Sequence, residues 1–185
     1  MSYRNILLVK LSAIGDVIHA LPVAHALKEA FPQARLTWIV EKPAYELVAG
    51  HPFIDEVILF EKARLRSLAG LKSYLPELMR NLKLKHFDLA LDLQGLLKSG
   101  MIAWLSGASQ RLVYCNTREF SDWISRKVCG PHQGGHIIEQ YLDVVRALGG
   151  PVSTVDFGIR FSAVESEAAQ GILAGSGWRG EPYVV

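Results

Sequence analysis

The sequence predicts an α/β fold, in which a Rossmann-like parallel sheet is flanked by helices, from three observations. Short runs of apolar and β-branched residues alternate along the chain with longer stretches of helical periodicity. Helical stretches between strands imply right-handed crossover connections, and therefore parallel strands. Polar residues also follow the first strand at the carboxyl edge of the predicted sheet, which is where α/β proteins bind ligands.

The first strand and the first helix supply the leading candidate for a functional residue. Residues 5–9 are apolar and predict a buried strand, a tight turn is expected at Gly15, and helical spacing continues to residue 31. Pro22 removes a backbone donor from this helix, so we expect a kink there or a late helix start. Asp16, at the helix N-terminus, is either a cap for the free N–H groups of the first turn or a general base. Its position alone favours the cap.

Further strands are predicted from β-branched and aromatic content at residues 35–40, 56–60, 87–93 and 110–115. Helical periodicity and flanking Gly or Pro residues predict helices at residues 44–49, 71–85, 99–105 and 136–148. The helix at 71–85 has an apolar side that we expect to pack on the sheet, and a basic outer side that is a weak membrane signal. Residues 116–135 form a long irregular stretch, which in a compact domain usually means a binding loop.

Basic and amide side chains follow two of these predicted strands. Arg64 and Arg66 come directly after the third strand, either in a solvated loop or as guanidinium groups that hold phosphates or carboxylates. After the fourth strand, Gly95 permits a tight turn that presents Gln94 and Lys98 at the carboxyl edge. Lys98 is otherwise an ordinary surface lysine of a first helical turn.

The 116–135 stretch and the residue that follows it contain three more candidates. Arg118 lies just beyond the fifth predicted strand, so we expect it to face the same anionic ligand. His132 and His136 flank a Gln-Gly-Gly run whose flexibility argues against a rigid metal site. His136 is instead expected to begin the helix that ends before Gly149.

Composition bears on partners and compartment. The 185 residues allow one domain with a real core, half of them are hydrophobic, and the net charge of +2 gives no argument for nucleic acid. We recognise no signal peptide and no membrane-spanning segment. Cys115 and Cys129 have no close pairing pattern, so a disulfide stays open, but reduced thiols are favoured and suit the cytosol.

Three motifs resemble those of the lipopolysaccharide heptosyltransferases, family 9 of the glycosyltransferases, in the family's order and over nearly the whole chain. The first comprises Lys10, Ser12, Gly15, Asp16, Val17, His19, Leu21 and Pro22; the second Asp92, Gln94, Gly95, Leu96, Lys98 and Ser99; the third Thr117, Arg118 and Glu119. The chain has Ala13 where the family commonly has Ser or Thr, so no hydroxyl contact is expected from that position.

The resemblance implies an inverting transferase that moves L-glycero-D-manno-heptose from ADP-heptose to the lipopolysaccharide inner core. Asp16 corresponds to the base that deprotonates the acceptor sugar. The acceptor-binding residues implied are Lys10, Ser12, Gly15, His19, Arg64, Arg66, Gln94, Gly95, Lys98 and Arg118. No metal or other cofactor is implied. The 117–119 motif and the basic run favour Kdo-lipid A over a first heptose as acceptor. The implied location is peripheral, at the cytoplasmic face of the inner membrane.

In the GT-B arrangement that the resemblance implies, an N-terminal acceptor domain faces a C-terminal donor domain. Residues 1–161 are predicted as the Rossmann-like acceptor domain, with a short extended piece from residue 155. Residues 162–185 are predicted as a polar helix at 163–174, a flexible link, and the first strand of a donor domain that the chain does not complete. Such a fragment is expected to fold but not to transfer sugar alone.

Two other enzyme classes fit the opening poorly. A dehydrogenase that binds NAD needs Gly-x-Gly-x-x-Gly at the first turn, where Gly15 stands alone, although Glu41 matches the acid expected after the second strand. A P-loop nucleotidase needs Gly-Lys-Ser/Thr after the first strand, which the chain lacks. The alternative that stays open is a non-catalytic Rossmann-like module that binds an anionic glycolipid or nucleotide.

Overall fold

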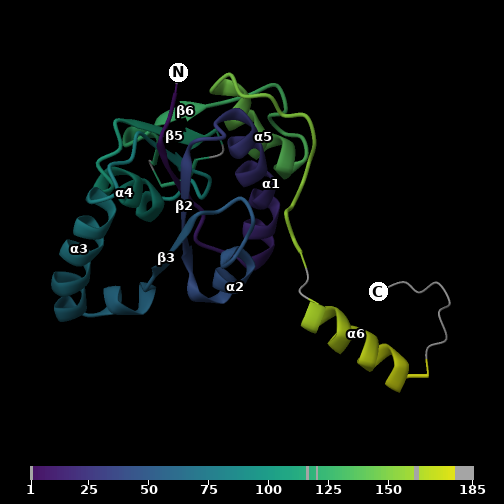
Figure 1. Ribbon diagram of the computed structural model, residues 1–185. Coiled ribbons are helices and arrows are strands. Elements are labelled where there is room, and N and C mark those ends of the chain that lie inside the picture. The colour runs from purple at the N-terminus through teal and green to yellow at the C-terminus, as the bar shows by residue number, and fades with distance from the viewer. Residues whose placement is uncertain (1, 116, 120, 161–162, 178–185) are drawn as a thin grey trace.

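The computed structural model describes residues 2–115, 117–119, 121–160 and 163–177. Its centre is a six-stranded sheet in which every paired strand is parallel, in the order β3-β2-β1-β4-β5-β6 (Figure 1). The strands are β1 (Asn5–Val9), β2 (Arg35–Glu41), β3 (Glu56–Phe60), β4 (Leu89–Asp92), β5 (Gln110–Tyr114) and β6 (Arg126–Val128). The predicted fold class is therefore confirmed.

Two layers of helices cover the sheet. The helices are α1 (Ile14–Ala30), α2 (Tyr45–Val48), α3 (Leu68–Lys83), α4 (Leu97–Leu105), α5 (Ile137–Ala147) and α6 (Ala163–Gly175), with short 3-10 turns η1 (Lys42–Ala44), η2 (Lys62–Arg66) and η3 (Ser121–Trp123). Helices α1 and α5 pack on one face and α3 and α4 on the other, as the two hydrophobic clusters show.

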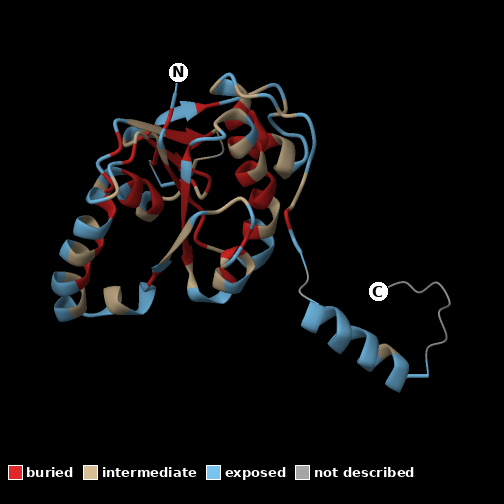
Figure 2. Ribbon diagram, in the orientation of Figure 1, coloured by how far each residue is buried: buried red, intermediate tan, exposed pale blue. Residues whose placement is uncertain are grey.

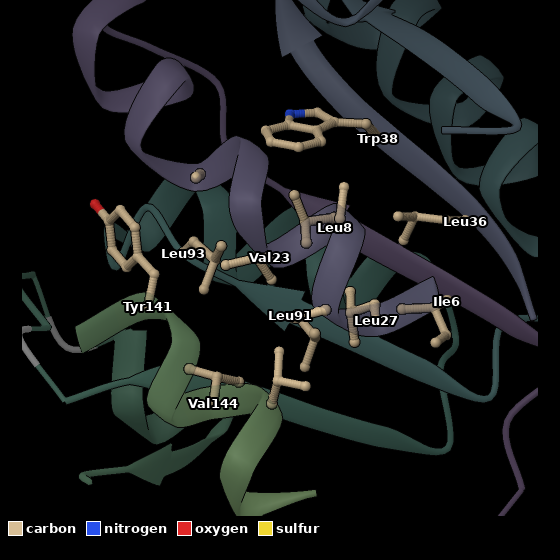
Figure 3. Packing of buried hydrophobic residues seen from close by; sticks show 14 of the residues in the cluster. Ile6, Leu8, Val23, Leu27, Leu36, Trp38, Leu91, Leu93, Tyr141 and Val144 are labelled. Atoms are coloured by element: carbon tan, nitrogen blue, oxygen red, sulfur yellow. The ribbon is translucent and has the colours of Figure 1, made fainter. Parts of the chain in front are cut away.

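Side-chain alternation along the strands fills both clusters. On β1, Ile6 and Leu8 point into the cluster with α1 and α5 (Figure 3), whereas Leu7 and Val9 belong to the cluster with α3 and α4. All four are fully buried. A sheet covered on both faces needs apolar residues at consecutive positions, which explains why the strands read as continuous hydrophobic runs.

Helix α1 differs from its prediction at Gly15 and at Pro22. It begins at Ile14 and continues through Pro22, so of the two expected alternatives the late start is wrong, and the kink stays a prediction. Gly15 lies inside the first helical turn without a left-handed φ, so the tight turn expected there is wrong as well. Pro22 is tolerated because Leu21 and Val23 beside it are fully buried, and tertiary packing of this kind outweighs one lost backbone hydrogen bond.

The 116–135 stretch is more regular than predicted. It contains η3 and the short strand β6, which extends the sheet beside β5, with Leu112 opposite Arg126 and Tyr114 opposite Val128. Asn116 and Phe120 lie outside the described residues. Strand β6 has only three residues, of which Arg126 and Lys127 are exposed, so it lacks the apolar run by which strands are recognised.

The cysteines form a disulfide, so the reduced thiols favoured from sequence are wrong. Cys115 and Cys129 are bonded, with their Cα atoms 4.8 Å apart and 14 residues of sequence separation. The register of the sheet explains the pairing, because the cysteines directly follow Tyr114 and Val128, which lie opposite each other on β5 and β6. The argument from reduced thiols to a cytosolic compartment falls with this correction.

Reduction of the Cys115–Cys129 bond is expected to lower the free energy of unfolding by about 3 kcal/mol, the value for releasing a closed loop of this length. Urea unfolding with and without dithiothreitol measures the difference. A Cys115→Ser/Cys129→Ser variant serves as control and should not respond to the reductant. Two titratable thiols in the unreduced, unfolded chain would contradict the disulfide.

The helix expected in the C-terminal part of the chain is present in the structure. Helix α6 covers the predicted 163–174 range and is exposed over almost its whole length (Figure 2). The extended piece expected from residue 155 has no strand assigned through residue 160, while residues 161–162 lie outside the described part. The strand expected at residues 182–185 also lies outside it. Within the described ranges, no helix has both the length and the apolar character needed to span a bilayer.

Candidate functional site

A cavity of about 280 Å³ opens at the carboxyl ends of β1, β4 and β5. Strands β2 and β3 lie on one side of β1, and β4, β5 and β6 lie on its other side. The order of the strands therefore reverses between β1 and β4, and the cavity lies at this switch point, where parallel sheets bind ligands. It is lined by Lys10, Asp16, Leu93, Gln94, Gly95, Leu96, Tyr114, Arg118, Ile137 and Tyr141. Half of these lining residues were predicted from sequence.

Lys10 is a buried ammonium group at the base of the cavity. Its side chain is 3% exposed, and its Nζ donates to the carbonyl oxygen of Leu93 at 3.2 Å and to the hydroxyl of Tyr141 at 2.9 Å. The same Nζ lies 3.7 Å from Oδ2 of Asp16. Burial lowers the pKa of Lys10 from its ordinary value, and the negative charges of Asp16 and Asp92 partly oppose this.

Asp16 presents its carboxylate at the cavity mouth. It stands in the first turn of α1, whose N-cap residue is Ala13, and its side chain is 51% exposed. Its carboxylate forms an ion pair with Lys10. The cap favoured from position alone has no hydrogen bond to support it among the described residues. The side chain is thus open to solvent and to a ligand on one side, and faces a cation on the other.

The loop between β4 and α4 is held by Asp92, which is fully buried. Its Oδ1 accepts the backbone N–H groups of Gln94 and Gly95, both at 2.9 Å, and its Oδ2 accepts the hydroxyl of Ser99 at 2.9 Å. Gly95 has a φ of +69°, a conformation that costs glycine little. Asp92 therefore shapes the cavity wall from beneath.

Gln94 joins this loop to the loop after β1. Its Oε1 accepts the backbone N–H groups of Leu11 at 3.0 Å and Ser12 at 3.2 Å. The amide oxygen of Gln94 is thus occupied within the protein, where it positions the loop after β1. The contact of Gln94 with the acceptor stays a prediction. Ser12 takes part through its backbone.

Burial raises the pKa of Asp92 to about 6, although the hydrogen bonds from Gly95, Ser99 and Gln94 oppose the shift. A carboxyl group whose pKa is higher in the folded state makes stability fall as the pH rises from about 4 to 6. Asp92→Asn should remove that contribution, on the order of 3 kcal/mol, while its Oδ1 still accepts the backbone N–H groups. The difference between the unfolding free energies of the two proteins, measured by urea across this pH range, should therefore change. Parallel curves would contradict the prediction.

Arg118 is brought to the cavity by its backbone. Its N–H donates to the carbonyl oxygen of Gly95 at 2.7 Å, which joins the loop after β5 to the loop after β4. The side chain is exposed and lines the cavity. A guanidinium group in this place offers paired donors to a carboxylate or phosphate.

Four predicted residues lie near the carboxyl edge but do not line this cavity. Ser12 and Gly15 border a separate, mostly apolar hollow between the loop after β1 and η1. The ring of His19 lies 6.2 Å from that of His136. Lys98 forms an ion pair of 2.9 Å with Glu41 at the end of β2.

Arg64 and Arg66 also lie apart from the cavity, on η2 after the edge strand β3. Arg64 forms ion pairs with Glu61 at 3.1 Å and Glu77 at 3.0 Å, and its guanidinium carbon lies 4.7 Å from the ring centre of Tyr74. In this conformation its charge is matched by two carboxylates. The assignment of both arginines to acceptor binding stays a prediction, and the structure does not join them to Asp16.

Sequence reasoning missed two tyrosines of the cavity. Tyr114 is the last residue of β5, a position at the carboxyl edge that could have singled it out. Tyr141 lies within α5, where nothing local distinguishes it from a core residue. Burial raises its pKa well above the ordinary value, so it acts as a neutral hydroxyl toward Lys10.

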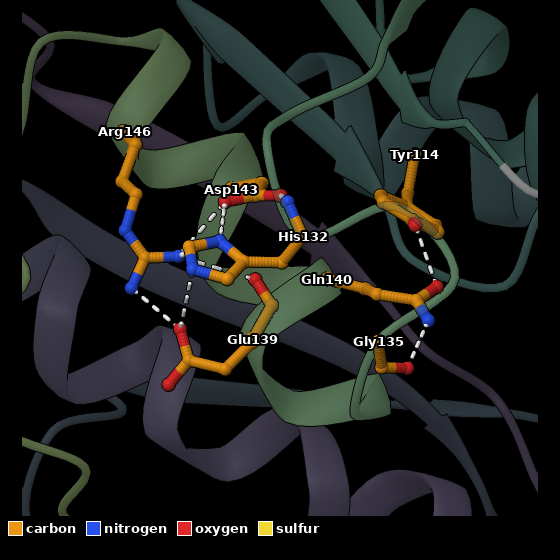
Figure 4. A network of polar contacts seen from close by, with 7 residues as sticks. All are labelled: Tyr114, His132, Gly135, Glu139, Gln140, Asp143 and Arg146. Carbon is orange, nitrogen blue, oxygen red and sulfur yellow. Dashed lines mark hydrogen bonds and ion pairs between the residues drawn. The ribbon is translucent and has the colours of Figure 1, made fainter.

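A network of polar residues fixes α5, and with it Tyr141, against the loop after β6 (Figure 4). Asp143 has a fully buried side chain whose Oδ1 lies 2.8 Å from both Nδ1 of His132 and Nη1 of Arg146. Arg146 also pairs with Glu139 at 2.6 Å. Burial would raise the pKa of Asp143, but these partners hold it below its ordinary value. Among the residues with described positions, no cluster of three potential metal ligands occurs.

Comparison with known proteins agrees with the motifs. The model of glycosyltransferase family 9 (heptosyltransferase) matches residues 76–173, just over half of the chain. Lipopolysaccharide heptosyltransferase 1 of Pseudomonas aeruginosa is 38% identical over 111 residues, which are 55% of this chain and 29% of that protein.

Solved structures of similar fold extend the likeness. The glycosyl transferase family 9 protein of Veillonella parvula superposes with a TM-score of 0.78 at 23% identity, over 96% of this chain and 51% of that one. The E. coli heptosyltransferase WaaC with ADP superposes with a TM-score of 0.71 at 24% identity, over 83% of this chain and 51% of that one. The chain thus spans about half of these structures and under a third of the Pseudomonas protein. The likeness to these structures confirms the fold, and the family model that matches more than half of the chain shows that the chain belongs to glycosyltransferase family 9, the heptosyltransferases.

Proposed function

We propose that this chain supplies the acceptor-binding part of a transferase that moves L-glycero-D-manno-heptose from ADP-heptose to the lipopolysaccharide inner core. The observation that carries the proposal is the pairing of the half-exposed carboxylate of Asp16 with the buried ammonium of Lys10 at the switch point of the sheet. The family membership and the ADP named with the E. coli structure support an ADP-linked donor.

In the proposed reaction, Asp16 accepts the proton of the acceptor hydroxyl. The hydroxyl oxygen attacks the anomeric carbon of the heptose, the bond to the diphosphate breaks, and the configuration inverts. Lys10 stays protonated between Leu93, Tyr141 and Asp16, so it holds the carboxylate in place before the proton arrives. The reaction needs no metal in this scheme, because cationic side chains and helix N-termini of the donor part suffice for the departing diphosphate.

The acceptor that fits best is Kdo-lipid A. Kdo carries a carboxylate, and the exposed guanidinium of Arg118 lines the same cavity as Asp16. Arg64 and Arg66 are proposed as further contacts to the anionic acceptor. Because this acceptor is anchored in lipid, we place the protein peripherally at the cytoplasmic face of the inner membrane.

Calorimetry tests the division of labour between the two parts. The chain should bind a delipidated Kdo-containing acceptor, and ADP-heptose should not bind. Arg118→Ala should weaken acceptor binding by about tenfold, as loss of a charge-assisted contact implies. Arg80→Ala, on the exposed side of α3, is the matched control and should leave affinity unchanged. Tight binding of ADP-heptose without acceptor binding would overturn the proposal.

A further inference from the structure

We infer that a surface formed by α3 and α4 docks onto an anionic lipid bilayer. This surface, called the α3–α4 face, comprises Leu68, Lys72, Leu75, Met79 and Lys83 of α3 and Leu97, Met101 and Trp104 of α4. The inference rests on the proposed function for the source of the lipid, since it places the acceptor's membrane beside the cavity.

Helix α4 exposes an apolar stripe. Leu97, Met101 and Trp104 recur at the spacing of one helix face and are 44%, 42% and 59% exposed. Ile102 and Ala103, on the opposite side, are buried in the core. The stripe is thus a second apolar face on a helix whose core-facing side is already satisfied. Packing within the described chain gives no reason for it.

Helix α3 continues this surface. Leu75 and Met79 are half-buried, and Leu68, two turns before Leu75 on the same side, is 78% exposed. Lys72 and Lys83 project from the same side and are exposed. The side chain of Lys83 lies close to Gly107, just after α4, which places this flank of α3 toward α4. Helices α3 and α4 are therefore neighbours, as Figures 1 and 2 also show, and we assign their apolar stripes to one surface.

Charge favours an anionic bilayer over another protein as the occupant. Residues 61–85, which carry η2 and α3, contain seven of the 20 basic residues but two of the 18 acidic residues of the chain. Both of these acids, Glu61 and Glu77, pair with Arg64, which leaves the lysines of the α3–α4 face unopposed by them. Exposed Leu, Met and Trp side chains flanked by lysines are the composition that inserts at a lipid headgroup boundary.

The position of the surface agrees with a membrane-borne acceptor. Leu96 lines the cavity, and α4 begins at the next residue with Leu97 of the apolar stripe. The docking surface and the cavity rim are therefore continuous along the chain. A bilayer in contact with the α3–α4 face brings a sugar attached to a lipid headgroup to the level of the cavity.

Vesicle flotation of the purified chain tests the inference. The chain should float with vesicles of equimolar phosphatidylcholine and phosphatidylglycerol, and bind phosphatidylcholine alone weakly. Trp104→Ser and, separately, Lys72→Glu/Lys83→Glu should each lower the partition onto anionic vesicles by roughly tenfold. The matched controls are Ile172→Ser on the exposed helix α6 and Arg4→Glu/Lys42→Glu, which changes the net charge equally. Circular dichroism verifies the fold of each variant.

Three outcomes would overturn the inference: failure to float with either vesicle, equal losses in the controls, and self-association abolished by Trp104→Ser without lipid binding. The last result would make the face an interface between two copies of the chain. All four variants should bind the delipidated acceptor as the wild-type chain does. Failure at the membrane is thereby distinguished from failure of the proposed function.

Discussion

Asp16→Asn is expected to lower the rate of heptose transfer by about 10²–10⁴-fold, the range that a general base contributes. The assay uses a protein that contains this chain together with a donor-binding part. Asparagine keeps the size of the side chain but cannot take the acceptor proton. Lys10 retains Leu93 and Tyr141 as partners when the carboxylate is lost, so the cavity should keep its shape. A coupled assay that detects ADP release measures the rate.

Asp122→Asn is the control for this substitution, because Asp122 of η3 forms an ion pair with Lys127 of β6 and does not line the cavity. Its turnover should equal that of the wild type. Calorimetry on the Asp16→Asn protein should still show acceptor binding. Unchanged transfer in that protein would remove Asp16 from the mechanism. Acceptor binding without transfer in the wild-type protein would favour the non-catalytic binding module.

Trp38→Ala is expected to lower the free energy of unfolding by about 3–5 kcal/mol, as for other large aromatic residues removed from a core. Trp38 on β2 is fully buried and packs beside Leu8 (Figure 3). Its Nε1–H also donates to the backbone carbonyl of Lys10 at 3.0 Å. The substitution therefore creates a cavity and removes a hydrogen bond next to the site. Urea unfolding gives the change.

The comparison for Trp38 is Trp104→Ala, which removes an exposed tryptophan of α4. That change should shift the unfolding free energy by no more than about 0.5 kcal/mol. Similar losses for both variants would mean that Trp38 does not occupy the centre of the core. Acceptor affinity should fall in the Trp38 variant, because the backbone that carries Lys10 loses its support.

The fold was predictable where the signal was local and repeated. The strands from residue 5 to residue 115 were found because consecutive buried positions need consecutive apolar residues. Strand β6 was missed because its pairing with β5 depends on register rather than on its own composition. The disulfide was missed for the same reason, since Cys115 and Cys129 become neighbours only when β5 and β6 align. Pro22 stays within α1 because of tertiary packing, which the propensities of neighbouring residues do not predict.

The site residues that follow strands at the carboxyl edge of the sheet were predictable from the sequence. Gly95 and Arg118 lie in the loops after β4 and β5, and Asp16 lies in the first helical turn after β1, so their places in the chain bring all three to the cavity. Tyr141 comes from the middle of a helix, and only the crossing of α5 over the sheet brings it to Lys10. Arg64 follows a strand too, but β3 is the far edge of the sheet, and residue order does not give that lateral distance.

The switch point also connects ligand binding to the folding equilibrium. Lys10 and Asp16 line the cavity from one side of the β1–β4 pairing, and all other lining residues come from position 93 onward. Neither half of the chain holds the site by itself. A ligand present at 100 times its dissociation constant should therefore raise global stability by about 2.7 kcal/mol. Hydrogen exchange should then slow in β1 and β5 together, rather than in one segment of the sheet.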